Sequence, residues 1–141
     1  MSLTPIVAIH MTAAILAIAT GPVALWARKS RLQRPRLHRA FGYGWVTLML
    51  VAAISAIFIR SEIGLHVPFG SLSFSPIHLL IPVVLAMLFV AFRFLIKGNI
   101  RGHRLTMVNL YIGACLVAGF FTLAPNRYLG RLVWGEWLGW V

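Results

Sequence analysis

Four histidines recur in two halves of the sequence, and they are the side chains best suited to chemistry. His10 opens one apolar run and His38 follows it by 28 residues; His78 opens another apolar run and His103 follows it by 25 residues. Imidazole is a common axial ligand of haem iron. If the fold brings the members of each pair face to face, the duplicated spacing predicts two pairs of iron ligands.

The composition excludes most other kinds of site. Of the 141 residues, 60% are hydrophobic and only two, Glu62 and Glu136, are acidic; soluble domains usually contain about 45–50% apolar residues. Neither paired carboxylates for acid–base catalysis nor a calcium or magnesium site is expected, and no catalytic residue is assigned. The single cysteine, Cys115, excludes an intrachain disulfide and a thiolate zinc site. The sequence therefore predicts an integral membrane protein.

Four apolar stretches predict four transmembrane helices. They cover residues 5–27, 40–59, 77–92 and 105–125, and the third reaches residue 96 if the side chain of Arg93 extends toward the headgroups. About 20 residues span the hydrocarbon core of a bilayer. Every backbone polar group must be satisfied locally in lipid, so each stretch is expected to be α-helical.

The basic residues predict the orientation of these helices. Ten of the 13 lie between the first and second stretches or around the connection of the third and fourth: Arg28, Lys29, Arg31, Arg34, Arg36, Arg39, Arg93, Lys97, Arg101 and Arg104. The positive-inside rule then places both connections in the cytoplasm and both termini outside, in a multi-pass protein of the bacterial cytoplasmic (inner) membrane. The net charge of +11 is expected to serve topology and anionic membrane lipid, and no nucleic acid partner is expected.

The expected fold is an all-α, antiparallel four-helix transmembrane bundle built from two repeated helical hairpins. The repeat halves are residues 5–60 and 72–125, within a bundle covering 1–127. The remaining residues, 128–141, are too short and glycine-interrupted to span. Their tyrosine and tryptophans suit the membrane–water boundary, so this tail is predicted to be an interfacial amphipathic helix.

An up-down-up-down bundle would pair the histidines across its diagonals. His10 and His78 would meet near the outer face, and His38 and His103 near the inner face. The 18 residues from His10 to the end of its helix at Arg28 correspond to about 27 Å, so two haem sites stacked across the membrane are expected. Arg39 and Arg104 directly follow the inner histidines, and each can pair with a haem propionate.

These motifs carry a resemblance to a known family. The elements are His10, the letters HRAFG from His38 to Gly42, His78, and the HR pair at 103–104. They resemble the four-helix di-haem core of the cytochrome b561 superfamily, and also small bacterial four-span membrane proteins of unknown function with an HR-x-x-G signature. The resemblance covers about residues 5–125. It implies transmembrane electron transfer between two b-type haems, with quinone or quinol as a partner, in a membrane oxidoreductase.

A function without haem stays open beside this one. A histidine at a helix end often caps the helix or binds a lipid headgroup, and gene duplication would copy such a histidine as faithfully as a ligand. The alternative is therefore a haem-free accessory or scaffold subunit that packs against a larger membrane complex through faces rich in small residues.

Overall fold

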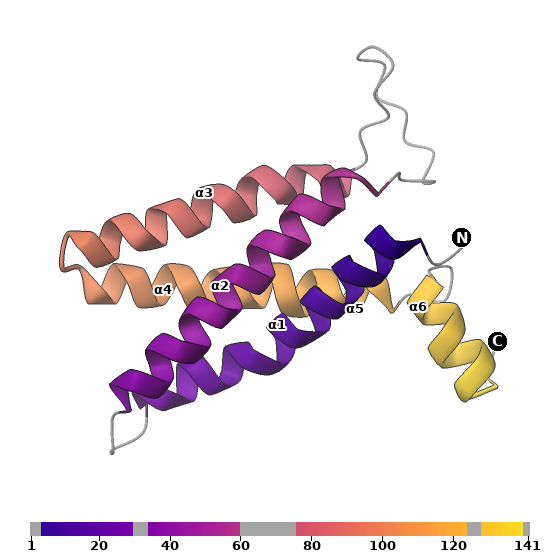
Figure 1. Ribbon diagram of the computed structural model, residues 1–141, viewed down its shortest axis with the longest axis horizontal. Helices are drawn as coiled ribbons and strands as arrows, with labels where there is room; N and C mark the ends of the chain where they lie inside the picture. Colours follow the sequence, from indigo (N-terminus) through magenta and orange to yellow (C-terminus); the bar gives the residue numbers. More distant parts are fainter. Residues whose placement is uncertain (1–3, 30–33, 60–75, 124–127, 140–141) are drawn as a thin grey trace, which may run out of the picture.

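The computed structural model describes residues 4–29, 34–59, 76–123 and 128–139, and all its regular structure in these ranges is helical (Figure 1). Three helices are single elements: α1 (Pro5–Lys29), α2 (Pro35–Ile57) and α3 (Pro76–Ile96). The fourth span is composite and runs through α4 (Ile100–Leu110), the π-helix η1 (Tyr111–Val117) and α5 (Ala118–Thr122). Four helices are thus long and apolar enough to cross a membrane, as predicted.

Two helices begin about one turn earlier than the apolar stretches indicated. α2 begins at Pro35 rather than residue 40, and α4 begins at Ile100 rather than residue 105. Proline suits the first turn because its missing N–H would have no helical partner there. At α4 the side chain of Asn99 accepts a 2.8 Å hydrogen bond from the Gly102 amide, which caps the helix. The prediction was wrong here because charged residues ended the apolar runs although they continue the helices.

The helices form an antiparallel bundle of two hairpins. α1 packs on α2 and α3 packs on α4, while α2–α3 and α1–η1 contacts join the hairpins. Going round the bundle, the order is therefore α1, α2, α3, α4, so α1 is diagonal to α3 and α2 is diagonal to α4, as expected. Figure 1 shows that the hairpins diverge toward the ends that carry the α1–α2 and α3–α4 connections.

The interior of the bundle is narrow and centres on residues from every span. Its fully enclosed members are Ala17, Trp45, Met49, Ala53, Val84, Leu88, Leu110 and Cys115. Large apolar side chains on all four spans, among them Ile15, Ile54, Phe89 and Phe120, are exposed. A surface of this kind is unstable in water and suited to lipid.

A proline and a tyrosine tie α1 to the fourth span in this interior. Pro22 lies inside α1 and has no amide hydrogen, so the carbonyl of Ile18, four residues earlier, lacks its helical donor. The Tyr111 hydroxyl donates a 3.0 Å hydrogen bond to this carbonyl. Gly21 makes room for the ring, because a Cβ at this position would lie 2.6 Å from Tyr111 Cδ2.

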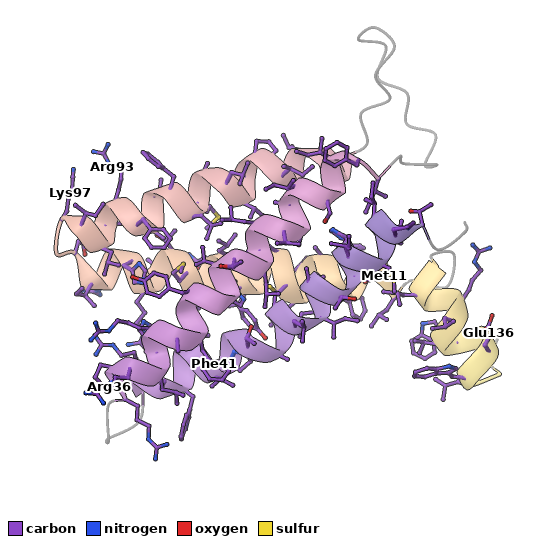
Figure 2. The ribbon with its side chains drawn as sticks, viewed as in Figure 1. Met11, Arg36, Phe41, Arg93, Lys97 and Glu136 are labelled. Carbon is purple, nitrogen blue, oxygen red and sulfur yellow. The ribbon has the colours of Figure 1, made fainter. Side chains whose placement is uncertain are left out.

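Charge separates the two ends of the bundle. Figure 2 shows Arg36, Arg93 and Lys97 at the end with the two hairpin connections, and Glu136 at the opposite end. Glu136 belongs to the helical tail, which comprises α6 (Tyr128–Gly130) and its π-helical continuation η2 (Arg131–Trp137). The Trp134 indole N–H donates to the Leu123 carbonyl at 2.7 Å, which holds the tail near the end of α5. The tail is helical as predicted, and its place at the membrane interface stays a prediction.

The close approach at Gly21 gives a test of the packing. The Gly21→Ala variant should lose about 1–3 kcal/mol of stability, because overpacking must displace the hydrogen-bonded Tyr111 ring. Thermal unfolding in detergent measures the effect. Gly44→Ala is the matched control, because a Cβ at Gly44 would meet nothing within 4 Å. Equal unfolding temperatures for the two variants would show that Tyr111 is not held against α1.

Candidate functional site

Two histidines of the first hairpin bond to the neighbouring helix rather than to their own. His10, on α1, has its Nδ1 2.9 Å from the Ala52 carbonyl oxygen of α2 and 3.2 Å from the Ser55 hydroxyl. His38, on α2, has its Nδ1 2.8 Å from the Ala24 carbonyl oxygen of α1. Both rings are half-buried. The two bonds therefore join α1 and α2 near both ends of the hairpin.

The second hairpin repeats the inner bond. His103, on α4, is half-buried and has its Nδ1 3.0 Å from the Ala91 carbonyl oxygen of α3. His38 and His103 each occupy the fourth position of their helix. The internal repeat found in the sequence thus extends to a repeated hydrogen bond, which connects the two helices of a hairpin in the same way in each half.

This bond determines which ring nitrogen carries the hydrogen. A carbonyl oxygen can only accept, so Nδ1 must donate in all three histidines, and a neutral imidazole then keeps a lone pair on Nε2. Within the ranges the structure describes, Nε2 of these histidines makes no hydrogen bond. Metal-ligating histidines almost always donate their other ring N–H to a carbonyl, carboxylate or water, which fixes tautomer and orientation. The three rings are therefore prepared for ligation through Nε2.

The bonds also fix the depth of the two levels. Ala24 follows His10 by 14 residues on α1, and Ala52 follows His38 by 14 residues on α2. Both helices thus give a separation of about 21 Å at 1.5 Å per residue. The expected 27 Å was too long, because it placed the inner level at Arg28, whereas His38 reaches one turn deeper to Ala24.

Part of the outer site lies outside the described residues. The backbone of His78 belongs to α3, 13 residues before Ala91, which corresponds to about 20 Å and agrees with the other helices. Its side chain is outside the described part, as are the residues considered as outer partners, listed as Arg60, Glu62, His66 and Arg127. The pairing of His10 with His78 stays a prediction.

The inner site has the sequence-predicted residues at the diverging ends of the hairpins. Arg39 and Arg104, each next to a histidine, have exposed side chains. One turn after His38, a Cβ added at Gly42 would meet nothing within 4 Å, so this face of α2 leaves room beside the ring. The described residues contain no group of three or more metal-binding side chains, but a site between two histidines does not require one. The donor set and the open glycine fit a bis-histidine haem.

Sequence reasoning missed the partners of the histidines. Ala24, Ala52 and Ala91 act through main-chain oxygens, and a backbone acceptor leaves no side-chain signature. The available signal was the small size of these residues, since alanine lets a neighbouring ring approach the helix backbone closely. Ala24 is 8% exposed and Ala91 is fully buried, so both carbonyls face a helix contact.

The tautomer can be measured directly. In 15N NMR spectra of the haem-free protein in detergent at neutral or higher pH, His10, His38 and His103 should each show a protonated Nδ1 and an unprotonated Nε2. The bound carbonyl requires a hydrogen on Nδ1. Single His→Gln variants assign the signals. A hydrogen on Nε2 of the neutral ring would show that the carbonyl contacts do not form.

Comparison with known proteins gives a family for this chain. Neither the curated proteins nor the solved structures contain a match. One family model matches residues 7–140, which covers all four spans and most of the tail. Its description names a membrane protein and no cofactor, in agreement with the four apolar helices. The chain belongs to the family described as "Predicted membrane protein (DUF2306)".

Proposed function

We propose that this protein is a di-haem b-type membrane cytochrome that passes electrons across the bilayer and exchanges them with quinone or quinol. The observation that carries the proposal is the repeated bond from histidine Nδ1 to a backbone carbonyl. It leaves Nε2 as the free donor atom on both levels of the bundle. The resemblance of the His10, HRAFG and HR motifs to the cytochrome b561 superfamily supports the same function.

Each level has a defined set of ligands under this proposal. His10 and His78 hold the outer iron, and His38 and His103 hold the inner iron. When bound, haem supplies one-electron oxidation and reduction at its iron. The carbonyl bonds of Ala24, Ala52 and Ala91 orient the rings and raise the basicity of Nε2. Arg39 and Arg104 bind the inner propionates through charge-assisted hydrogen bonds.

The orientation follows from charge. The end that carries the hairpin connections is rich in arginine and lysine, and Figure 2 shows Arg36, Arg93 and Lys97 there. Positive residues are retained on the cytoplasmic side, so we place His38 and His103 near the cytoplasm. The termini and the α6–η2 tail then lie on the outer face of the bacterial inner membrane.

A second candidate is favoured by the same hydrogen bonds. They connect α1 to α2 and α3 to α4, so the histidines can serve only to hold the hairpins together. Gene duplication would copy such a bond as well. The protein would then be a haem-free scaffold subunit of a larger membrane complex, which its exposed apolar helix faces would contact.

Spectroscopy of matched variants distinguishes the two candidates. The protein purified in detergent from haem-supplied cells should show the sharp reduced-minus-oxidised bands of bis-imidazole haem, with about two haems per chain. His38→Gln and His103→Gln should each remove the same haem, and His10→Gln and His78→Gln the other. Glutamine keeps an N–H that can donate to the carbonyl, so helix content should persist. His66→Ala should leave the spectrum unchanged.

The outcomes of this experiment are separable. A parent protein that folds with no haem bands supports the scaffold. Loss of both haems in every histidine variant, with helix content retained, contradicts two separate levels. Loss of helix content in the glutamine variants supports a role of the histidines in holding the hairpins together.

The orientation has its own test. In a Cys115→Ala background, which removes the one native cysteine, Glu136→Cys should react with a membrane-impermeant maleimide in intact cells. Lys97→Cys should react only after the membrane is opened, because it lies at the basic end. Both positions are exposed, so access to the side chain does not limit the reaction. The reverse labelling pattern would invert the topology.

A further inference from the structure

Two aromatic side chains meet at the centre of the bundle from diagonal spans. Trp45 of α2 and Tyr111 of η1 have ring centroids 6.4 Å apart and planes inclined by 52°. This tilted contact is in the range preferred by aromatic pairs. The diagonal spans that carry His38 and His103 therefore approach closely at this depth.

The pair lies midway between the two histidine levels. Trp45 follows His38 by seven residues and precedes Ala52, the partner of His10, by seven residues. Each step corresponds to about 10 Å. Tyr111 follows His103 by eight residues, or about 12 Å. Both helices thus place an aromatic ring at half the distance between the levels.

The surrounding structure holds the rings in place. The Tyr111 hydroxyl donates to the Ile18 carbonyl at 3.0 Å, the carbonyl freed by Pro22. Gly21 admits the ring, since any Cβ there would meet both Tyr111 and Trp45 Nε1. Tyr111 also opens the π-helix η1, and such stretches occur frequently at functional sites.

Trp45 retains a polar group for which packing gives no reason. The side chain is 4% exposed, and among the described residues its Nε1 is buried without a hydrogen-bond partner. An unpaired buried donor costs about 1–3 kcal/mol. Phenylalanine would fill much of the same space without this cost, so the indole ring itself is what the position requires.

We propose that the Trp45–Tyr111 pair is the bridge through which electrons pass between the two histidine levels, an inference that rests on the proposed function. One electron leaves a ferrous iron at one level, which becomes ferric, and a ferric iron at the other level becomes ferrous. The electron tunnels through the contacting π systems. Neither ring is oxidised or gains a proton, and Tyr111 keeps its hydrogen on the Ile18 carbonyl. No further oxidant or reductant is needed for this step.

Pulse radiolysis tests the bridge in the two-haem protein. A fast phase reduces one haem, and a second phase redistributes the electron between the levels. The second phase should slow several-fold in Trp45→Leu and Tyr111→Leu, and it should be absent in His38→Gln, which empties one level. Tyr111→Phe keeps the ring and should retain the parent rate. Phe120→Leu, at a 77% exposed position on α5, is the matched aromatic control and should also retain it.

The stability of the haem-free protein provides an independent measurement. Trp45→Phe should leave the unfolding temperature of the haem-free protein unchanged or raised, because it removes the unpaired N–H, while slowing the second phase in the loaded protein. A lowered unfolding temperature with an unchanged second phase would overturn the bridge and make Trp45 a packing residue. If the parent binds no haem, the proposed function fails and the bridge fails with it. Two bound haems with no rate change in either leucine variant would reject the bridge alone.

Discussion

The hydrogen bond from an imidazole Nδ1 to a carbonyl of the adjacent helix determines most of what this bundle can do. It occurs at His10, His38 and His103. In an apolar bundle, where little water competes, an unmade bond of this kind would leave a polar group unsatisfied at considerable cost. The bond therefore orients each ring, joins the two helices of a hairpin, and reserves Nε2 for another partner.

Small residues make this bond geometrically possible. A helical carbonyl already accepts from the amide four residues later, but its second lone pair stays available. A ring from the next helix can reach it only where side chains are short. Alanines fill this role at Ala24, Ala52 and Ala91, and Gly21 does the same for the Tyr111 ring. The closeness of the helices and the placement of polar groups thus have one origin.

Hydropathy and charge predicted the four spans, the two hairpins and the diagonal order correctly, because lipid imposes length and local hydrogen bonding on any chain. They misplaced the beginnings of α2 and α4, since a helix continues through Arg39 or Arg104 into the headgroup region while an apolar count stops there. The depth of the inner level needed coordinates, because His38 reaches Ala24 through the main chain. The Trp45–Tyr111 contact was equally hidden, since two aromatic residues 66 positions apart share no sequence pattern.

The spacing of the levels favours ligation over a purely structural use of the histidines. Helices joined near their ends need only bonds wherever they happen to touch, whereas His10 and His38 give a separation of 14 residues on both α1 and α2. The position of His78 relative to Ala91 on α3 gives nearly the same value. Equal spacing on three helices places the levels in register across both hairpins. Two flat cofactors that each bridge diagonal helices require such register, because both ligands of one iron must lie at the same depth.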